Sequence, residues 1–237
     1  MFRIPLRARS AAQVLGLFAI LWFVDSAAAP VAGDVAAPQL AVGDHWQYRV
    51  TDNLRRGAVS QLDAEVIAVT GGTARIRFSH ADASGRAEWI DEVNAAGSLV
   101  TGSLNHEPSR PFNPPAQMLA FPLDKGKTWR QTINTVRADT GLKDQILIYG
   151  RVDGPSATTV PAGRFDAVYV FRTLQLDDAE FWRTRTMRRD AIWYAPAAKA
   201  AVREKREAQY TEKDARNPPV RTESRLLELM SFQPGGK

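Results

Sequence analysis

Apolar and polar residues alternate along most of the chain with a period of two, the period of a β-strand with one buried face. After the turn signal Gly71-Gly72, Ile76 and Phe78 fall on the face opposite Arg75 and Arg77. No stretch sustains a helical period. Strands are predicted at 42–50, 62–69, 74–78, 86–93, 98–100, 128–136, 145–152, 160–171, 181–195, 200–210 and 221–232.

This pattern predicts an all-β fold with little helix. About ten strands are too many for one flat open sheet, so we expect a strongly curved antiparallel meander sheet or an incomplete barrel. Residues 42–232 are predicted to form a single β-sheet domain with two lobes, divided by a proline-rich loop at 102–117. A flexible linker is expected at 29–41 and a disordered tail at 233–237.

The segment 160–171 is the sharpest turn-to-strand signal in the sequence. Pro161 fixes φ and removes a donor, and Gly163 can adopt the positive φ that a sharp reversal needs. The β-branched and aromatic residues that follow favour a half-buried strand. Because its only charged residues are Arg164 and Asp166, we interpret the segment as an architectural corner rather than a site.

The N-terminus has the organisation of a secretory signal peptide. Three arginines precede a short apolar run at 14–24, and small residues follow at 26–29. The apolar run is shorter than the roughly 18–20 residues of a membrane-spanning helix, so cleavage is favoured over an uncleaved anchor. Cleavage after Ala28 is preferred, because cleavage after Ala29 would leave Pro30 at the first mature position. We therefore expect a periplasmic or secreted protein that is not integral to the membrane once processed.

Composition narrows the chemistry. The chain contains no cysteine, which rules out a thiol nucleophile, disulfides and lipidation of a mature N-terminal cysteine. Its net charge is +5, but residues 1–28 hold three arginines and one aspartate, so processing leaves +3. A nucleic-acid partner is not expected.

Catalytic motifs are absent from the sequence. The histidines, His45, His80 and His106, lack the spacing of a metal site, although Asp44-His45 and His80-x-Asp82 could meet in space. Acidic pairs such as Asp91-Glu92 are typical of solvated turns or strand ends. We expect no cofactor, no metal and no enzymatic activity. A hydrolase with a carboxylate site is the least favoured of three functional hypotheses, and the two binding hypotheses are given below.

The arginine-rich run at 183–189 allows two interpretations. Arg183 and Arg185 could form a basic platform for phosphate or carboxylate groups. Alternatively, a two-residue turn at 197–198 would place Asp190 opposite Lys205 and Arg188 opposite Glu207, as cross-strand pairs on a solvated face. The second interpretation is favoured, and it leaves Arg183 and Arg185 as the better binding candidates.

Three aromatic residues complete the candidate ligand-binding set. Trp193 and Tyr194 are adjacent in a predicted strand, so one of them must point away from the core or into a cleft. Trp182 lies beside Arg183. Tryptophan side chains are more often core than ligand platform, since they bury a large apolar area.

Four motifs occur in a fixed order: G-x-x-W at 43–46, P-L-x-x-G-x-x-W at 122–129, V-P-A-G-x-F at 160–165 and W-Y-x-P at 193–196. With the closing segment 226–232, this order resembles a family of exported bacterial β-sheet proteins of unknown function. The resemblance covers most of 42–232. It departs after Pro196, where the family tends to have glycines and this chain has alanines and a lysine.

The resemblance implies no catalytic residues. It implies, more remotely, a fold similar to periplasmic lipoprotein carriers, in which an incomplete barrel surrounds a hydrophobic cavity. The leading hypothesis is a non-enzymatic periplasmic protein that binds an apolar or amphipathic envelope component, a lipid or lipid-linked group, in the concave side of the sheet. The alternative is a protein- or glycan-interaction module that uses the outer sheet face and the arginine patch, with an envelope protein as partner.

Overall fold

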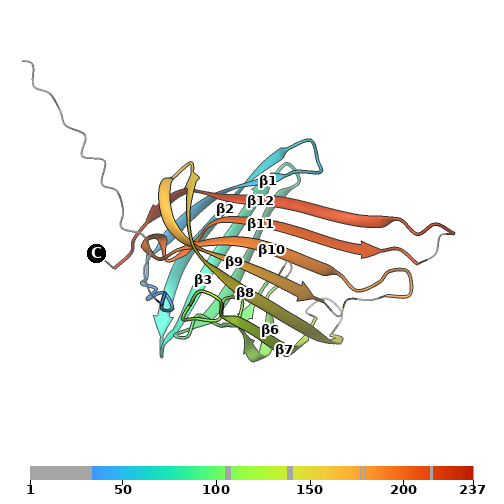
Figure 1. Cartoon of the computed structure of the whole chain (residues 1–237), viewed down its shortest axis with the longest axis horizontal. Helices are drawn as coiled ribbons and strands as arrows, with labels where there is room; N and C mark the ends of the chain where they lie inside the picture. Colours follow the sequence, from blue (N-terminus) through green and yellow to red (C-terminus); the bar gives the residue numbers. More distant parts are fainter. Residues whose placement is uncertain are drawn as a thin grey trace, which may run out of the picture.

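The computed structural model describes residues 34–104, 108–137, 141–176, 178, 180–213 and 216–236. Within these ranges twelve antiparallel strands follow one another around a closed barrel, and the first strand pairs with the last (Figure 1). The strands are β1 His45–Asp52, β2 Ala58–Thr70, β3 Thr73–Asp82, β4 Gly85–Asn94, β5 Leu99–Gly102, β6 Arg110–Ala116, β7 Thr128–Val136, β8 Lys143–Val160, β9 Gly163–Gln175, β10 Met187–Ala195, β11 Ala200–Thr211 and β12 Val220–Gln233.

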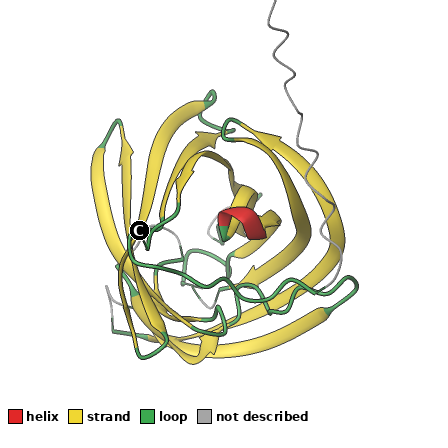
Figure 2. Cartoon of the chain, turned by 90° about the vertical axis from the view of Figure 1, so that its left-hand side faces the viewer, coloured by secondary structure: helices red, strands yellow, loops and turns green. Residues whose placement is uncertain are grey.

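The all-β prediction is confirmed, and the curved sheet closes on itself. A single short 3₁₀ helix, η1 (Pro196–Ala198), joins β10 to β11 within the described residues. Viewed along the barrel, η1 lies inside the ring of strands (Figure 2). It therefore lies within the lumen rather than on the outer surface.

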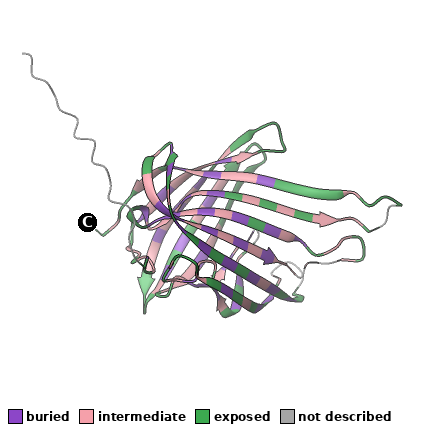
Figure 3. Ribbon diagram, in the orientation of Figure 1, coloured by how far each residue is buried: buried purple, intermediate pink, exposed green. Residues whose placement is uncertain are grey.

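Burial follows the two-residue period most clearly along β2, β7, β8 and β10, where one face of the strand lines the interior (Figure 3). On β8, Ile146, Ile148 and Val152 are almost inaccessible, whereas Leu147, Tyr149 and Arg151 lie on the opposite face of the strand. Each such aliphatic side chain contributes about 1.5–3 kcal/mol when fully buried. The alternation read in the sequence is thus the alternation between lumen and outer surface.

The corner predicted at 160–171 is present. Pro161 and Ala162 form a two-residue turn between β8 and β9, and Val160 pairs with Gly163 across it. Gly163 has φ of 126°, a value that only glycine adopts without strain. The strand that follows contributes Val168 and Val170 to the core.

The prediction of a proline-rich loop at 102–117 is wrong over much of that range, because β6 occupies Arg110–Ala116. Its prolines lack backbone donors, and β6 pairs with β7 only at Phe112 and Asn113. Side chains replace the missing ladder bonds: the Thr135 hydroxyl donates to the Pro111 carbonyl at 2.7 Å and the Gln131 amide to that of Pro115 at 2.9 Å. The sheet therefore continues through this segment.

The cross-strand pairing predicted for the arginine run is also wrong. Asp190 lies opposite Arg206 and Arg188 opposite Ala208, because η1 and a bulge after Trp193 replace the expected two-residue turn. Lys199 follows η1 with φ of 54°, the left-handed conformation that glycine would favour. Arg188 and Asp190 are buried rather than solvated.

The two ends of the domain are tied to the barrel. Val35, in the expected linker, is buried and pairs with Leu123. In the expected tail, the Gly235 amide donates to the buried carboxylate of Asp44 at 2.8 Å, and the Gly236 amide donates to the Val42 carbonyl. The predicted signal peptide and His106 lie outside the described residues, and no helix in the described part is long and apolar enough to cross a membrane.

Candidate functional site: two chambers separated by buried charge

The lumen contains an apolar chamber of about 270 Å³ at the end near η1. Inward-facing residues of β1, β3 and β10 supply most of its wall, and the segment between β6 and β7 covers one side. Its principal apolar lining residues are Trp46, Tyr48, Ile76, Phe78, Met118, Leu119, Phe121, Ile192 and Tyr194.

The indole of Trp46 and the hydroxyl of Tyr48 both have backbone hydrogen-bond partners. The Trp46 indole donates to the Ala198 carbonyl at 2.7 Å, and the Tyr48 hydroxyl donates to the Ala201 carbonyl at 3.0 Å. Burial raises the pKa of Tyr48 and of Tyr194 above the ordinary value for tyrosine. Away from Lys199, Arg172 and Glu204 at its ends, the chamber therefore presents a mainly apolar surface to a ligand.

Lys199 lines this chamber at the point where η1 meets β11. Its ammonium group lies 2.8 Å from Oδ2 and 3.0 Å from Oδ1 of Asp44, which has no exposed surface. Burial alone would raise the pKa of Asp44, but Lys199 and the amides of Ala41 and Gly235 lower it. The carboxylate thus connects η1 to both ends of the described chain.

A layer of buried charge forms the inner end of the apolar chamber. Arg172 on β9 donates to Asp190 on β10 at 2.9 Å and 2.7 Å, and Arg188 donates to the other oxygen of Asp190 at 2.8 Å. Glu204 on β11 accepts hydrogen bonds from Arg172 at 3.2 Å and from Arg206 at 2.9 Å and 3.1 Å. We call these five residues the charge layer.

The charge layer is held in place by its surroundings. Arg172 donates to the Met118 carbonyl at 2.9 Å and Arg188 to the Leu104 carbonyl at 2.6 Å. Burial would raise the pKa of Asp190, but Arg188 and Arg172 lower it to about 2. Asp190 is therefore ionised throughout the physiological range.

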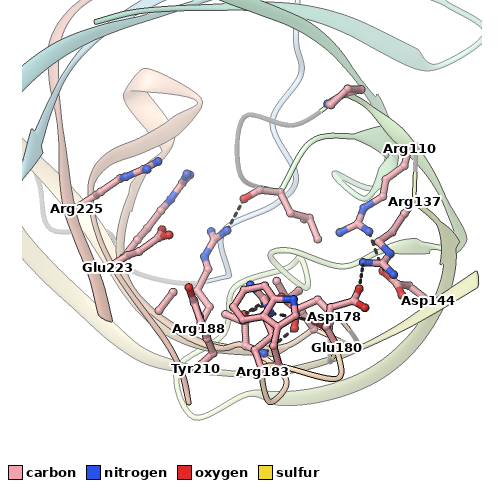
Figure 4. A pocket seen from close by; sticks show the side chains of 17 residues that line it. Arg110, Arg137, Asp144, Asp178, Glu180, Arg183, Arg188, Tyr210, Glu223 and Arg225 are labelled. Carbon is pink, nitrogen blue, oxygen red and sulfur yellow. Dashed lines mark hydrogen bonds and ion pairs between the residues drawn. The ribbon is translucent and has the colours of Figure 1, made fainter. Parts of the chain in front are cut away.

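A polar chamber of about 420 Å³ lies beyond the charge layer, toward the opposite end of the barrel (Figure 4). Arg188 and Arg206 belong to both the layer and the chamber wall, whereas Arg172 and Glu204 face the apolar chamber. The charged residues that line the polar chamber are Arg110, Arg137, Asp144, Asp178, Glu180, Arg183, Arg188, Arg206, Glu223 and Arg225.

Several of these residues form pairs along the wall. Asp144 lies 3.3 Å from Arg110 and 3.5 Å from Arg137, and Arg137 also donates to Glu180 at 3.1 Å. Arg183 pairs with Asp178 at the mouth. Figure 4 shows Glu223 and Arg225 on the side of the chamber opposite Arg110 and Arg137.

Asp91 on β4 is a further buried carboxyl near the charge layer. Burial raises its pKa to about 7, although the Ser103 amide, which donates at 3.0 Å, and the charge of Arg206 oppose this shift. Of the carboxyl groups near the charge layer, Asp91 is the one whose charge changes close to neutral pH.

The five residues predicted to bind ligand separate into three places. Tyr194 is buried in the apolar chamber, where its ring meets Phe121 edge-on at 5.2 Å. Trp182 and Arg183 line the polar chamber, with the guanidinium of Arg183 4.4 Å from the ring of Tyr210. Trp193 is outward, beside Tyr169 and Arg203, and Arg185 lines a shallow hollow on the outer surface.

The histidines do not form a metal centre in the described residues, in which no group of three His, Cys, Asp or Glu side chains could hold a metal ion. His45 lies 3.7 Å from Asp63, and His80 is 2.8 Å from the Ser60 hydroxyl. Asp44 is occupied by Lys199.

Sequence reasoning missed Arg172, Asp190 and Glu204. A signal for Asp190 was present, since it lies two residues before Ile192 and four before Tyr194, on the same strand face. If those apolar residues face the lumen, Asp190 does too. The predicted pairing of Asp190 with Lys205 instead placed Asp190 on a solvated face.

The fold resembles that of a candidate lipoprotein from Parabacteroides distasonis ATCC 8503, with a TM-score of 0.51 at 11% identity over 85% of this chain and 100% of that chain. A candidate exported protein with a YmcC-like fold from Bacteroides fragilis NCTC 9343 aligns with a TM-score of 0.48 at 12% identity, over 85% of this chain and 100% of that one. No family model and no curated protein matches the chain.

At this identity the first similarity shows the fold alone. That fold agrees with the predicted curved all-β architecture. The ordered motifs at 43–46, 122–129, 160–165 and 193–196 stay a prediction about family membership.

Proposed function

We propose that this is a non-enzymatic protein of the bacterial cell envelope that binds an apolar chain or ring in the chamber near η1. The observation that carries the proposal is the apolar chamber itself, which the barrel partly encloses and which aromatic and aliphatic side chains line. The expected ligand is a lipid or a lipid-linked group.

The dimensions and chemistry of the chamber support this ligand class. Apolar cavities of about 150 Å³ stay dry and accept a benzene-sized ligand, and this chamber measures about 270 Å³. Arg172 and Glu204 stand at its inner end and already satisfy each other. A short acyl or isoprenoid segment fits this arrangement better than a polar metabolite, because the remaining wall offers few hydrogen-bonding groups.

An apolar fluorescent probe, 1-N-phenylnaphthylamine, tests the proposal directly. We expect saturable binding, displaced by a medium-chain fatty acid. The variant Ala201→Leu adds three carbons to the chamber wall and should weaken probe binding about tenfold or more.

Ala191→Leu is the matched control. Ala191 precedes Ile192 on β10 and faces the outer surface, so the same substitution there should leave probe affinity unchanged. If Ala201→Leu binds the probe as well as the unmodified protein, or if both variants lose binding equally, the chamber is not the binding site. Organic extraction of protein purified from an envelope fraction, followed by mass spectrometry, would identify the natural ligand.

The alternative, an interaction module that uses an arginine patch on the outer face, has less support. Arg183 lines the polar chamber and Arg185 the outer surface, so the two do not form one patch. Trp193 is covered in part by Tyr169 and Arg203.

A further inference from the structure

The polar chamber has an excess of positive charge. Six arginines and four carboxylates line it, all of them on strands or adjoining segments of the barrel. At about 420 Å³ it lies within the size range of small-ligand sites. Arginine keeps its charge at any physiological pH, so this excess is permanent.

The excess extends into the charge layer that forms the chamber's floor. Three guanidinium groups, those of Arg172, Arg188 and Arg206, share the two carboxylates of Asp190 and Glu204. Burial, with repulsion from Arg206 and Arg172, lowers the pKa of Arg188 despite the attraction of Asp190. A buried positive charge without a full complement of anions is unfavourable, and an arriving anion would relieve it.

Two donors on the floor are available to such an anion. Nη1 of Arg206 makes no hydrogen bond to any residue in the described ranges, since its Nε and Nη2 both donate to Glu204. Nη2 of Arg188 lies 3.6 Å from Glu204, beyond hydrogen-bond distance. Because Asp190 pairs with Arg206 across β10 and β11, Arg188 and Arg206 are diagonal neighbours on the lumen face.

We infer that the polar chamber binds a small phosphate-bearing ligand, whose phosphate oxygens accept hydrogen bonds from Arg188 and Arg206. Guanidinium groups match the geometry of phosphate oxygens, and charge-assisted hydrogen bonds of this kind are roughly twice as strong as neutral ones. Arg225 on the wall adds long-range attraction, and Glu223 opposes it. The inference does not depend on the apolar chamber, which lies on the other side of the charge layer.

The first test uses glycerol 3-phosphate and isothermal titration calorimetry on the full-length processed protein. We expect saturable binding that weakens as salt concentration rises. Arg206→Gln should weaken binding about tenfold, the equivalent of one charge-assisted hydrogen bond. Since Arg206 also supports the barrel, the decisive variants are two wall residues outside the charge layer.

Those variants are Arg225→Gln and Glu223→Gln, two residues apart on β12. Arg225→Gln should weaken binding about threefold, whereas Glu223→Gln should strengthen it about twofold. A non-specific effect on folding would not produce opposite signs at neighbouring positions. Arg185→Gln, which removes an arginine from the outer surface, is the control and should leave the affinity unchanged.

A second ligand, soluble dihexanoyl phosphatidylglycerol, distinguishes a lipid headgroup from a soluble phosphate as the source of the bound group. Tighter binding of this lipid than of glycerol phosphate, with the same sensitivity to Arg225→Gln, would identify a lipid headgroup; equal or weaker binding would identify a soluble phosphate. Absence of binding by both ligands up to about 10 mM would overturn the inference. So would equal effects of Arg225→Gln and Arg185→Gln.

Discussion

Substitution of Asp190 by asparagine is the sharpest test of the charge layer. Asp190 has no exposed surface and accepts three hydrogen bonds, two from Arg172 and one from Arg188. Asparagine has nearly the same shape, but it removes the negative charge and presents an amide donor to one of the guanidinium groups. The substitution therefore leaves two buried arginines with incomplete compensation.

The expected loss of stability is about 3–5 kcal/mol, the usual cost of removing one partner from a buried ion pair. This is a large part of the 5–15 kcal/mol that typically separates folded from unfolded protein. The matched control is Glu207→Gln on β11. Glu207 lies 2.7 Å from Lys205, and both side chains are about half exposed, so its loss should change stability by at most about 1 kcal/mol.

Urea unfolding followed by tryptophan fluorescence and far-ultraviolet circular dichroism measures both variants. The pH dependence gives a second signature. The folded pKa of Asp190, about 2, lies below its unfolded value of 3.8, so its contribution is complete above pH 3.8 and is lost as pH falls through 2. Asp190→Asn should lack this acid-dependent loss. A variant within 1 kcal/mol of the unmodified protein would refute the assigned role.

Three other substitutions probe separate features. Because the pKa of Asp91 rises from 3.8 to about 7 on folding, the free energy of unfolding should fall as pH rises from about 4 to 7. The variant Asp91→Asn should abolish this fall and be more stable than the unmodified protein at pH 8, by up to about 4 kcal/mol. Identical urea-unfolding profiles of the two proteins across this pH range would contradict the prediction. Gly150→Ala would place a Cβ 2.1–2.4 Å from the ring of Trp129. We expect urea unfolding to show a loss of about 1–3 kcal/mol in the free energy of unfolding, and we expect the near-ultraviolet circular dichroism spectrum to change. Unchanged values of both would show that the Trp129 ring can move aside. Lys199→Met removes the cation from buried Asp44, which should cost about 1–3 kcal/mol and, since Lys199 also lines the apolar chamber, accelerate release of the apolar probe in stopped-flow experiments. An unchanged release rate would show that Lys199 does not control access to the chamber.

Most strands were predictable because each has one face toward the lumen and one toward solvent. That arrangement produces a two-residue period that needs no tertiary information. The turn at Pro161 and Gly163 was predictable for a similar local reason. Strand β6 was not, since three prolines lie in it and its pairing depends on the side chains of Gln131 and Thr135 from another strand.

The local pattern places Asp190 on the strand face of Ile192 and Tyr194, but it does not reveal the charge layer as a whole. On β10, Arg188 and Asp190 alternate with other residues just as surface charges would, and burial depends on which face meets the lumen. The deciding information lies in Arg172 and Glu204, which come from β9 and β11 and meet Asp190 only after the barrel closes. The predicted register between β10 and β11 was wrong for another reason: Pro196–Ala198 forms a 3₁₀ turn instead of a two-residue hairpin turn.

The charge layer also limits what the barrel can hold. A long acyl chain entering beside Lys199 reaches Arg172 and Glu204, and it could continue into the polar chamber only by separating Arg172 from Asp190 at 2.7 Å and from Glu204 at 3.2 Å. That separation would expose buried charges to an apolar chain, at a cost that exceeds the gain of a few additional buried methylene groups, about 0.8 kcal/mol each. The apolar chamber therefore selects a short segment, and a phosphate in the other chamber would belong to a separate ligand or to a group that enters from the opposite end.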